Sequence, residues 1–509
     1  MFFDHTKLCH FALTSLILTL SGCGGKAGPT QTSPVTAASV ASVTSVGTDF
    51  YLTLPDHLCV SDNSSCNNLP VANKLIIAAS AATSGEITFN NVVTPFSVMA
   101  GNQAVITLDA GVVLTSNELV EAKGIHITAL SPVSVYVVSE NATSADGYLA
   151  LPTAGLGTSY YVMSRSSSRY SGSEFAVVAS RNATTLNITP SASGASKAAG
   201  VAFTVLLNAG DTYQFANTGS ADMTGTLITS DQPVAVFGGH RCADVPSGVG
   251  YCDYLVEQLP DTSAWGNTFH TAPFSGRSRY TVRVLASQDN TTFATIPAGL
   301  LGTLNAGQFA DVDLTTAAEI ISSNPVLVAQ FMRGYADDIA AKGDPSMVLI
   351  TPAEMGMTES TFAVHGLAGT SGAFISIVTE SSSLGNLTLD SAVVDPALFT
   401  PLGGNSNYSF ATIPVPAGTH TLLGTAAYSA HIYDYGIAWN AVSYAYPVGR
   451  MLSVPVSTIT PTLPPVCDEE DDEDEDEHDD ECKYEHTSSS LHHHHRNKRG
   501  HDHRCHHHS

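Results

Sequence analysis

Residues 175–188 read FAVVASRNATTLNI and contain two strand-like runs, Phe175–Ser180 and Asn182–Ile188, on either side of a polar break. The arrangement returns further along the chain, where Tyr280–Ser287 precedes Asn290–Ile296. Valine, isoleucine, phenylalanine and threonine fit the pleated surface of a strand, and short runs bounded by Asn, Asp or Gly are typical of β-hairpins. These segments therefore predict a hairpin-like pair of strands that recurs along the chain.

Two further markers recur beside these pairs. An Ala-Gly dipeptide stands at Ala100-Gly101, Ala209-Gly210, Ala306-Gly307 and Ala417-Gly418, with spacings of 109, 97 and 111 residues. Downstream apolar runs begin with Pro132, Pro233 and Pro325. Proline lacks an N–H group and suits the first residue of a strand. We therefore expect four tandem copies of one unit of about 100 residues.

Each copy has room for about seven strands, and helical periodicity is nearly absent from the chain. The fold class is therefore predicted to be all-β. Because about 100 residues is the size of a β-sandwich, four sandwiches in series are the first architecture. A closed ring that resembles a β-propeller is the alternative, because the copies follow one another without linkers.

The N-terminus carries the features of a bacterial lipoprotein signal. Leu8–Leu20 is mostly apolar and too short to span ~30 Å of hydrocarbon as a helix, but it suits a signal peptide. It leads into Leu20-Ser21-Gly22-Cys23, which is similar to a lipobox, the motif whose cysteine accepts a diacylglycerol. We expect residues 1–22 to be removed and Cys23 to anchor the exported protein in an outer membrane or at the cell surface.

Composition divides the remaining chain into four parts. Residues 23–46 are rich in Ser, Thr, Ala and Pro and are predicted to be a flexible linker. The β-repeat body is expected at 47–450, and a second, Pro/Thr-rich linker at 451–466. Residues 467–509 are acidic and then histidine-rich, which predicts a disordered tail. The net charge of −26 argues against nucleic acid as a partner, because a phosphate backbone demands a basic surface.

The cysteines indicate disulfides in an oxidising compartment. Cys59 and Cys66 form one close pair inside the body, and Cys242 and Cys252 form another. Short loops closed in this way stabilise a fold by roughly 2–3 kcal/mol each. In the tail, Cys467 and Cys482 are candidates for a third disulfide, and Cys505 is then left over.

Several motifs in the body form an ordered set, which begins with GTDFYLTLP at residues 47–55 and ends with SYAYP at 443–447. Between them stand PVAVFGGH at 233–240, Cys242 and Cys252, EQLP at 257–260 and the pair Trp265-Gly266. In these motifs the body resembles the N-terminal domain of the IgGFc-binding protein family. The resemblance implies an extracellular binding or adhesive module. It does not imply that this chain binds IgG.

The loop between Cys242 and Cys252 is the candidate ligand-binding region of the body. His240, Arg241, Asp253 and Glu257 gather around it, and binding loops sit on rigid scaffolds. A histidine near a carboxylate can also perform acid–base catalysis, but these residues fit a disulfide-pinned loop better. No G-x-S-x-G, HExxH or phosphate-binding loop stands in a supporting context, so the chain is predicted not to be an enzyme and to require no cofactor. The isolated His365, His420 and His431 are interpreted as structural.

The tail has the most distinctive chemical composition in the sequence. Residues 468–481 hold thirteen Asp or Glu residues and one histidine. Neutral imidazoles bind Zn²⁺, Ni²⁺ and Cu²⁺, and a histidine tract offers overlapping ligand sets without a folded site. The alternative is a solvated, disordered brush. The candidate metal ligands are His478, His486, His492, His493, His494, His495, His501, His503, His506, His507 and His508.

Together these features predict a surface-anchored lipoprotein that acts as a non-catalytic binding or adhesion module. Its partners are expected to be the membrane, through the lipid, and a protein or glycan of the envelope, the matrix or another cell. The alternative function is metal scavenging by the tail, with the β body as a scaffold.

Overall fold

The computed structural model describes residues 42–296, 299–338, 341–370, 372–404, 406–437 and 442–452. Within these ranges the chain forms four antiparallel sheets of seven, eight, seven and eight strands, so the predicted all-β class with four repeated units is confirmed. In the described ranges, helix is confined to α1 (Leu58–Ser61) and short 3-10 turns such as η1 (Asn63–Cys66). None of the helices in the described ranges is long and apolar enough to cross a membrane.

The strands of each sheet follow one another closely along the chain, with one exception. The first sheet contains β1 (Gly47–Leu52), β2 (Ala72–Ala79), β3 (Thr83–Phe89), β4 (Val92–Val98), β5 (Asn102–Leu108), β7 (Ile125–Glu140) and β8 (Ala145–Leu149). The second contains β6 (Val120–Glu121), β9 (Gly157–Tyr161), β10 (Ser173–Ala179), β11 (Thr184–Thr189), β12 (Phe203–Leu207), β13 (Thr212–Ala216), β14 (Leu227–Ala243) and β15 (Asp253–Leu259). The exception is β6, which leaves the first unit to pair with β13 of the second.

The other two sheets repeat the plan. The third contains β16 (Gly266–Thr271), β17 (Tyr280–Ala286), β18 (Thr291–Ile296), β19 (Gly299–Leu304), β20 (Phe309–Leu314), β21 (Ala318–Met332) and β22 (Ser346–Leu349). The fourth contains β23 (Met357–Val364), β24 (Phe374–Glu380), β25 (Thr388–Leu389), β26 (Ala392–Val393), β27 (Thr400–Pro401), β28 (Tyr408–Pro414), β29 (Gly418–Tyr435) and β30 (Ser443–Pro447).

One long strand organises each sheet: β7, β14, β21 and β29, of 15 to 18 residues. In the first unit, residues 125–129 of β7 pair with β1 and β3, whereas residues 134–140 pair with β2 and β8. A strand that changes partners halfway lets one sheet fold into two facing layers. Each unit is therefore sandwich-like, as the sequence predicts.

The prolines stand at this change of partners and not at the start of a strand. Pro132, Pro233 and Pro325 lie inside β7, β14 and β21, which corrects the expectation that they open separate strands. In β14 the pairing with β9 shifts register between Thr229 and Val234, on either side of Pro233. Because proline has no N–H to give to a ladder, it is tolerated where pairing is interrupted.

The hairpin-like pairs are also corrected by the sheet order. The strands β10 and β11 follow each other in sequence, but β14 lies between them and pairs with both. The Ala-Gly marker occupies the same structural position in three of the four units. There the backbone N–H groups of Gly101, Gly210 and Gly307 donate to the carbonyl oxygen of the last residue of β2, β10 and β17, respectively. Gly418 opens β29 instead.

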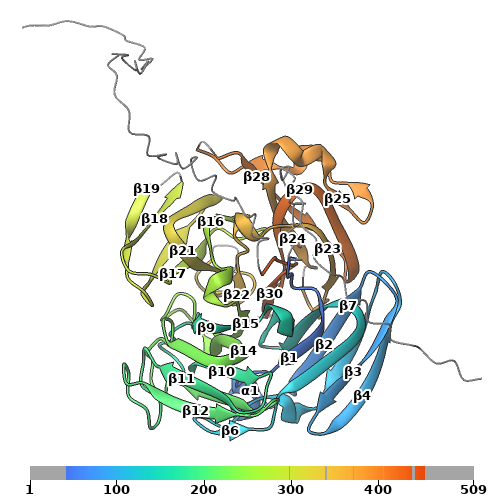
Figure 1. The fold of residues 1–509 in the computed structure, drawn as a ribbon. Coiled ribbons are helices and arrows are strands. Elements are labelled where there is room, and N and C mark those ends of the chain that lie inside the picture. The colour runs from blue at the N-terminus through green and yellow to red at the C-terminus, as the bar shows by residue number, and fades with distance from the viewer. Residues whose placement is uncertain are drawn as a thin grey trace, which may run out of the picture. The chain divides into compact units, whose positions relative to one another are not determined.

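The four units are arranged around a common axis, as Figure 1 shows. Their last strands contact one another in a closed circle, with β8 against β15 and β30, and β22 against the same two strands. Every residue of these four strands is buried. Strands buried on both faces need neighbours on all sides, so the ring, and not an open series, is the arrangement that covers them.

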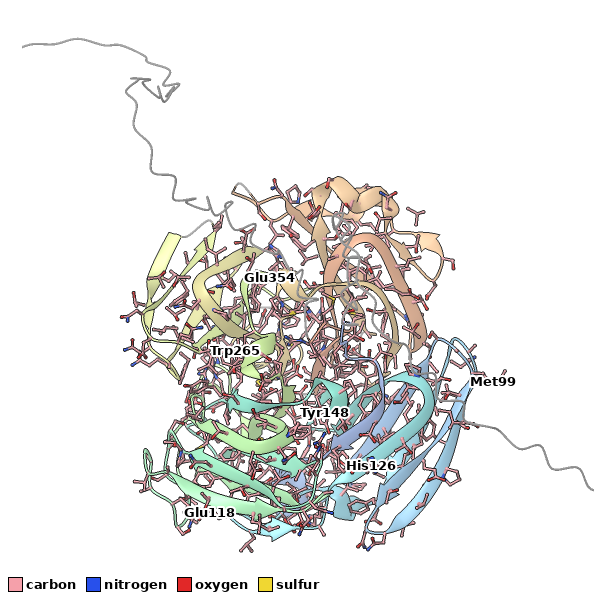
Figure 2. All side chains as sticks on the ribbon, in the orientation of Figure 1. Met99, Glu118, His126, Tyr148, Trp265 and Glu354 are labelled. Carbon is pink, nitrogen blue, oxygen red and sulfur yellow. A yellow bond between two sulfur atoms is a disulfide. The ribbon has the colours of Figure 1, made fainter. Side chains whose placement is uncertain are left out.

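The two ends of the described chain close the ring. Thr44 forms a β-bridge with Met451, and the N–H of Ser45 donates to the carbonyl of Arg450 (2.9 Å). Side chains in the interior are buried, and side chains at the rim are exposed to solvent. Tyr148 and Trp265 are 0% and 4% exposed, whereas Met99 is 74% exposed at the periphery (Figure 2).

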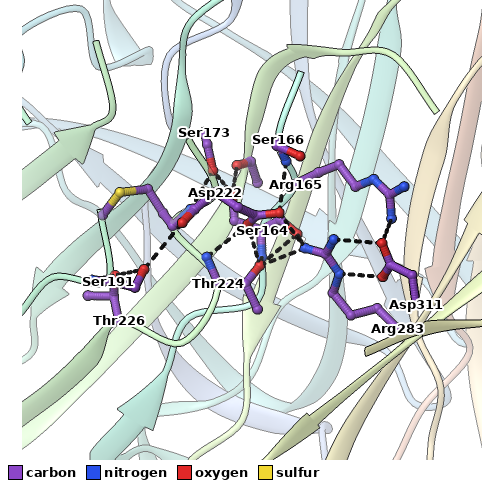
Figure 3. A network of polar contacts seen from close by, with 12 residues as sticks. Ser164, Arg165, Ser166, Ser173, Ser191, Asp222, Thr224, Thr226, Arg283 and Asp311 are labelled. Carbon is purple, nitrogen blue, oxygen red and sulfur yellow. Dashed lines mark hydrogen bonds and ion pairs between the residues drawn. The ribbon is translucent and has the colours of Figure 1, made fainter. Parts of the chain in front are cut away.

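A buried arginine joins the second and third units (Figure 3). The guanidinium of Arg283 in β17 binds Asp311 in the same sheet through Nε (2.7 Å) and Nη2 (2.9 Å). Its Nη1 reaches across the seam to Asp222 (2.7 Å) in the loop before β14. Burial raises the pKa of Asp222, but Arg283 and Thr224 outweigh that effect and hold it below its usual value. A fully paired charge of this kind orients the two units.

Candidate functional site

A carboxyl group from β8 lies among the inner strands at the axis. Asp146 Oδ2 accepts hydrogen bonds from the backbone N–H groups of Val256 (3.2 Å) and Met347 (3.3 Å). Its Oδ1 accepts from the N–H of Ala445 (3.2 Å). One side chain of the first unit is thus bonded to the backbone of each of the other three. Burial raises the pKa of Asp146 well above its usual value, and the N–H donors oppose that shift.

A second set of polar groups closes the axis where the inner strands begin. Ser144 Oγ donates to Asp253 Oδ1, and the N–H of Ser443 donates to Asp253 Oδ2 (3.3 Å). The N–H of Asp344 donates to Ser443 Oγ (2.7 Å). Each unit contributes one of these four residues, at or just before its last strand. We call Ser144, Asp253, Asp344 and Ser443 the polar ring.

Asp344 differs from the other members of the polar ring. Its Oδ1 is buried and has no hydrogen-bond partner among the residues that the structure describes. Burial raises the pKa of Asp344 to about 8, and the guanidinium of Arg277 acts in the opposite direction. Burial also raises the pKa of Asp253 well above its usual value, and Asp344 adds to that shift. Two carboxyl groups that disfavour each other's charged form therefore stand at one end of the axis.

A cleft of about 560 Å³ opens at this end of the ring, and its lining includes Ser144 and Asp344. Its walls come from segments that are far apart in the chain and belong to the first three units. We call it the axial cleft. It is lined by Leu58, Cys59, Ser65, Cys66, Asn67, Thr143, Ser144, Arg169, Tyr170, Cys242, Gly250, Tyr251, Cys252 and Asp344.

Both predicted disulfides of the body are confirmed, and both line the axial cleft. Cys59 and Cys66 (Cα–Cα 5.2 Å) tie α1 to η1 in the first unit. Cys242 and Cys252 (Cα–Cα 5.1 Å) close the loop between β14 and β15. Because a disulfide removes conformational freedom from the loop that it closes, two walls of the cleft are pinned to the scaffold.

A histidine supports each disulfide from within the protein. His57 Nδ1 accepts the N–H of Cys59 (3.1 Å), and His240 Nδ1 accepts the N–H of Cys242 (2.9 Å). Both side chains are almost completely buried. Burial lowers the pKa of each imidazole to about 3, so both are neutral at physiological pH. A nitrogen that accepts an N–H bond must carry no proton, which agrees with the neutral form.

These histidines predict a loss of stability in acid. In the unfolded chain their pKa returns to about 6.5, so the unfolded state binds protons that the folded state refuses, and stability is lost as pH falls below 6.5. At pH 5 each histidine costs about 2 kcal/mol relative to pH 7.5. A His57→Gln variant, whose amide oxygen can still accept, should therefore lose about 2 kcal/mol less than the unmodified chain between these pH values in urea unfolding. Equal losses in the two chains would contradict the assignment.

The structure does not gather the four residues predicted around the Cys242 loop into one site. His240 is buried and accepts the N–H of Cys242, and Arg241 donates to the carbonyl of Ser171 through Nε (2.7 Å). Asp253 belongs to the polar ring, and Glu257 accepts the N–H of Leu349 (2.9 Å) inside the axis. Two of the four therefore hold the inner strands together.

The other isolated histidines have structural partners or lie in the core. His365 Nε2 contacts Glu140 at the seam between the fourth and first units (2.7 Å), and His420 Nδ1 contacts Asp390 (2.6 Å). His431 is buried, and burial lowers its pKa to about 4.

Sequence reasoning missed most of the cleft. Asp344, Ser144 and the Arg169-Tyr170 pair carry no local motif, and each belongs to a different loop. The one available signal was the histidine two residues before a cysteine, which occurs at both His57 and His240.

No group of three or more His, Cys, Asp or Glu side chains in the described ranges is placed to hold a metal ion. Cys23, the tail pair Cys467 and Cys482, and the eleven histidines predicted as metal ligands lie outside the described residues.

Comparison with known proteins agrees with the resemblance found in the sequence. The model of the IgGFc binding protein family matches residues 146–433, which is more than half of the chain and begins at the axial Asp146. A human protein named IgGFc-binding protein is 27% identical over 336 residues, which cover 64% of this chain but 6% of the human protein. The family is described by binding and not by a catalysed reaction. The chain therefore belongs to the IgGFc-binding protein family.

Proposed function

We propose that this chain is a lipid-anchored, non-catalytic binding protein of the outer membrane or cell surface, and that the axial cleft receives its ligand. The observation that carries the proposal is the construction of the cleft. Loops from three units converge there, and disulfides hold two of them against a rigid ring. Binding residues are typically carried by loops that a rigid scaffold positions.

The anchoring part of the proposal rests on Cys23, which follows a short apolar run in a lipobox-like context. Export is also in keeping with two short-loop disulfides, which persist in oxidising compartments. We infer that the segment between Cys23 and Thr44, where the chain joins the ring, holds the ring away from the membrane.

The proposed ligand class is a protein, or a glycan carried by a protein, of the envelope, the matrix or another cell. The human relative is named for binding the Fc part of IgG. Only the general property, binding of an extracellular macromolecule, is extended to this chain, because the shared region is a small part of that relative.

A variant in which a bulky side chain fills the axial cleft tests this function. Gly250 lines the cleft, and a Cβ at this position would meet nothing closer than Arg169 Nη2 at 3.9 Å. Gly250→Trp should therefore fold and fill the cleft, whereas Ser382→Trp places the same side chain on an exposed turn of the fourth unit. We expect the full chain and Ser382→Trp to capture the same envelope or matrix component, and Gly250→Trp to capture at least tenfold less by quantitative pull-down. Equal capture by all three would place the ligand elsewhere.

We propose a second activity for the tail, metal binding, because residues 467–509 hold 11 of the 20 histidines of the chain. Imidazoles bind transition metals only when neutral, so affinity should fall as pH drops below about 6. Calorimetric titration of Zn²⁺ into the full chain and into a chain ending at Pro465 tests this. We expect binding at pH 7.5 that is lost on truncation and weakens at least tenfold at pH 5. Binding that survives truncation would assign the metal to the body.

A further inference from the structure

We propose that the floor of the axial cleft recognises a primary ammonium group, of the kind that a lysine side chain of a protein ligand presents, through the carboxyl group of Asp344. This inference rests on the proposed function, because it assigns a ligand chemistry to the same cleft.

The geometry singles out one oxygen atom. In the polar ring, Asp253 uses both carboxylate oxygens, which accept from Ser144 and from the N–H of Ser443. Asp344 also lines the cleft, but its Oδ1 has no hydrogen-bond partner in the described part of the chain, and the residue is 1% exposed. A buried acceptor left without a donor costs about 1–3 kcal/mol. A ligand that brings a donor to this oxygen would recover that free energy.

The number of carboxylate oxygens that are available on Asp344 determines which kind of cation it can bind well. Calcium requires six to eight oxygen ligands, and no cluster of three metal-binding side chains exists in the described ranges. A guanidinium group binds a carboxylate best through two parallel hydrogen bonds, which needs both oxygens. An ammonium group is a compact point charge that is satisfied by one strong contact. A single unpartnered oxygen on a residue that lines the cleft therefore favours a lysine-like ammonium over Ca²⁺ and over a guanidinium group.

The charges around Asp344 set how strongly it attracts a cation. Arg277 lies close enough to favour the ionised form of Asp344, whereas Asp253 at the axis is the neighbouring carboxyl group. Arg169 is an exposed residue in the lining of the same cleft, and its side chain makes no hydrogen bond or ion pair with the residues that the structure describes. We expect Arg169 to repel an incoming cation and Asp344 to attract it.

Because a proton must leave Asp344 when the cation binds, the affinity for the cation should depend on pH. Burial raises the pKa of Asp344 to about 8, so below that pH an ammonium must displace a proton to bind the carboxylate. Lysine itself stays protonated up to about pH 10. Affinity for the cation should therefore rise by about tenfold for each pH unit between 6 and 8 and level off above that range.

The test titrates the full chain with N-α-acetyl-lysine methylamide and with the same compound acetylated on its side-chain nitrogen, which removes the charge. We expect the charged probe to bind at least tenfold more tightly than the neutral probe at pH 8, with the rise from pH 6 to 8 described above. Asp344→Asn should abolish both the preference and the pH dependence. Arg169→Gln, an exposed position, should strengthen binding of the charged probe about twofold by removing a like charge.

Equal affinity for the two probes at pH 8 would overturn the assignment, as would an unchanged preference in Asp344→Asn. If Asp344→Asn does not fold, Arg169→Gln decides the matter: charged-probe affinity that stays the same or falls would overturn it. These outcomes are separate from the proposed function. If Gly250→Trp blocks capture of the macromolecular ligand while the two probes bind equally, the cleft remains the binding site and only the ammonium assignment fails.

Discussion

Replacing Asp146 by alanine is expected to lower the free energy of unfolding by at least about 3 kcal/mol. The substitution removes the acceptor of three buried N–H groups, those of Val256, Met347 and Ala445, and each unsatisfied donor costs about 1–3 kcal/mol. The three donors come from three different units, so the loss should also loosen the closure of the ring. Urea unfolding followed by circular dichroism measures the first effect, and protease susceptibility in the absence of denaturant measures the second.

Two control variants test whether the loss of stability comes from the hydrogen bonds of Asp146. Asp231→Ala removes an exposed carboxylate whose single backbone bond, to the N–H of Thr185, lies at the surface, and should cost less than about 1 kcal/mol. Asp146→Asn keeps one acceptor oxygen but turns an NH₂ group toward the N–H donors, so its stability should fall between those of the original chain and Asp146→Ala. A loss below about 1 kcal/mol in Asp146→Ala would show that these three hydrogen bonds do not hold the axis together.

Replacing Arg283 by methionine is expected to cost about 3–5 kcal/mol, because it leaves the carboxylate of Asp222 without its charged partner. Arg283 is 2% exposed, and its guanidinium binds Asp222 across the seam and Asp311 within its own sheet (Figure 3). Methionine retains much of the volume, so the loss reports the charge and its hydrogen bonds. Chemical unfolding of the full chain provides the measurement.

The matched control for Arg283→Met is the same substitution at an exposed arginine. Arg181 makes one long hydrogen bond, to Gln232 (3.3 Å), and Arg181→Met should change stability by less than about 0.5 kcal/mol. Adding Asp222→Asn to Arg283→Met should restore part of the lost stability, because it removes the unpaired charge. A double variant as unstable as the single variant would show that Arg283 acts through packing on Phe309 and not through the seam.

Much of the fold was predictable, because its signals are local. Strand alternation identified the runs that became β10, β11, β17 and β18 within a few residues of their observed bounds. Close spacing in sequence paired Cys59 with Cys66 and Cys242 with Cys252. Each of these features depends on residues no more than ten positions apart, and backbone geometry at that range follows from the residues themselves.

The order of the strands was not predictable in the same way. Nothing in residues 175–188 reveals that β14, which starts almost forty residues later, inserts between the two strands and pairs with both. Pro233 marks the break in that long strand, but the same residue also suits the first position of a strand, and pattern alone does not separate the two. The candidate site was even less accessible: the polar ring draws one residue from each of four units, separated by about one hundred positions.

The sequence by itself determined the all-β class, the fourfold repetition, the two disulfides and the family, because each rests on short-range patterns or on motifs in a set order. Only the tertiary structure decided that the units form a ring and that Asp146 and the polar ring occupy its axis. It also decided that loops from three units enclose a cleft. The reason is physical: the inner strands are buried on both faces, and which surfaces cover them depends on the packing of whole units. Residues at the axis are neighbours because the ring closes, and no stretch of local sequence records that closure.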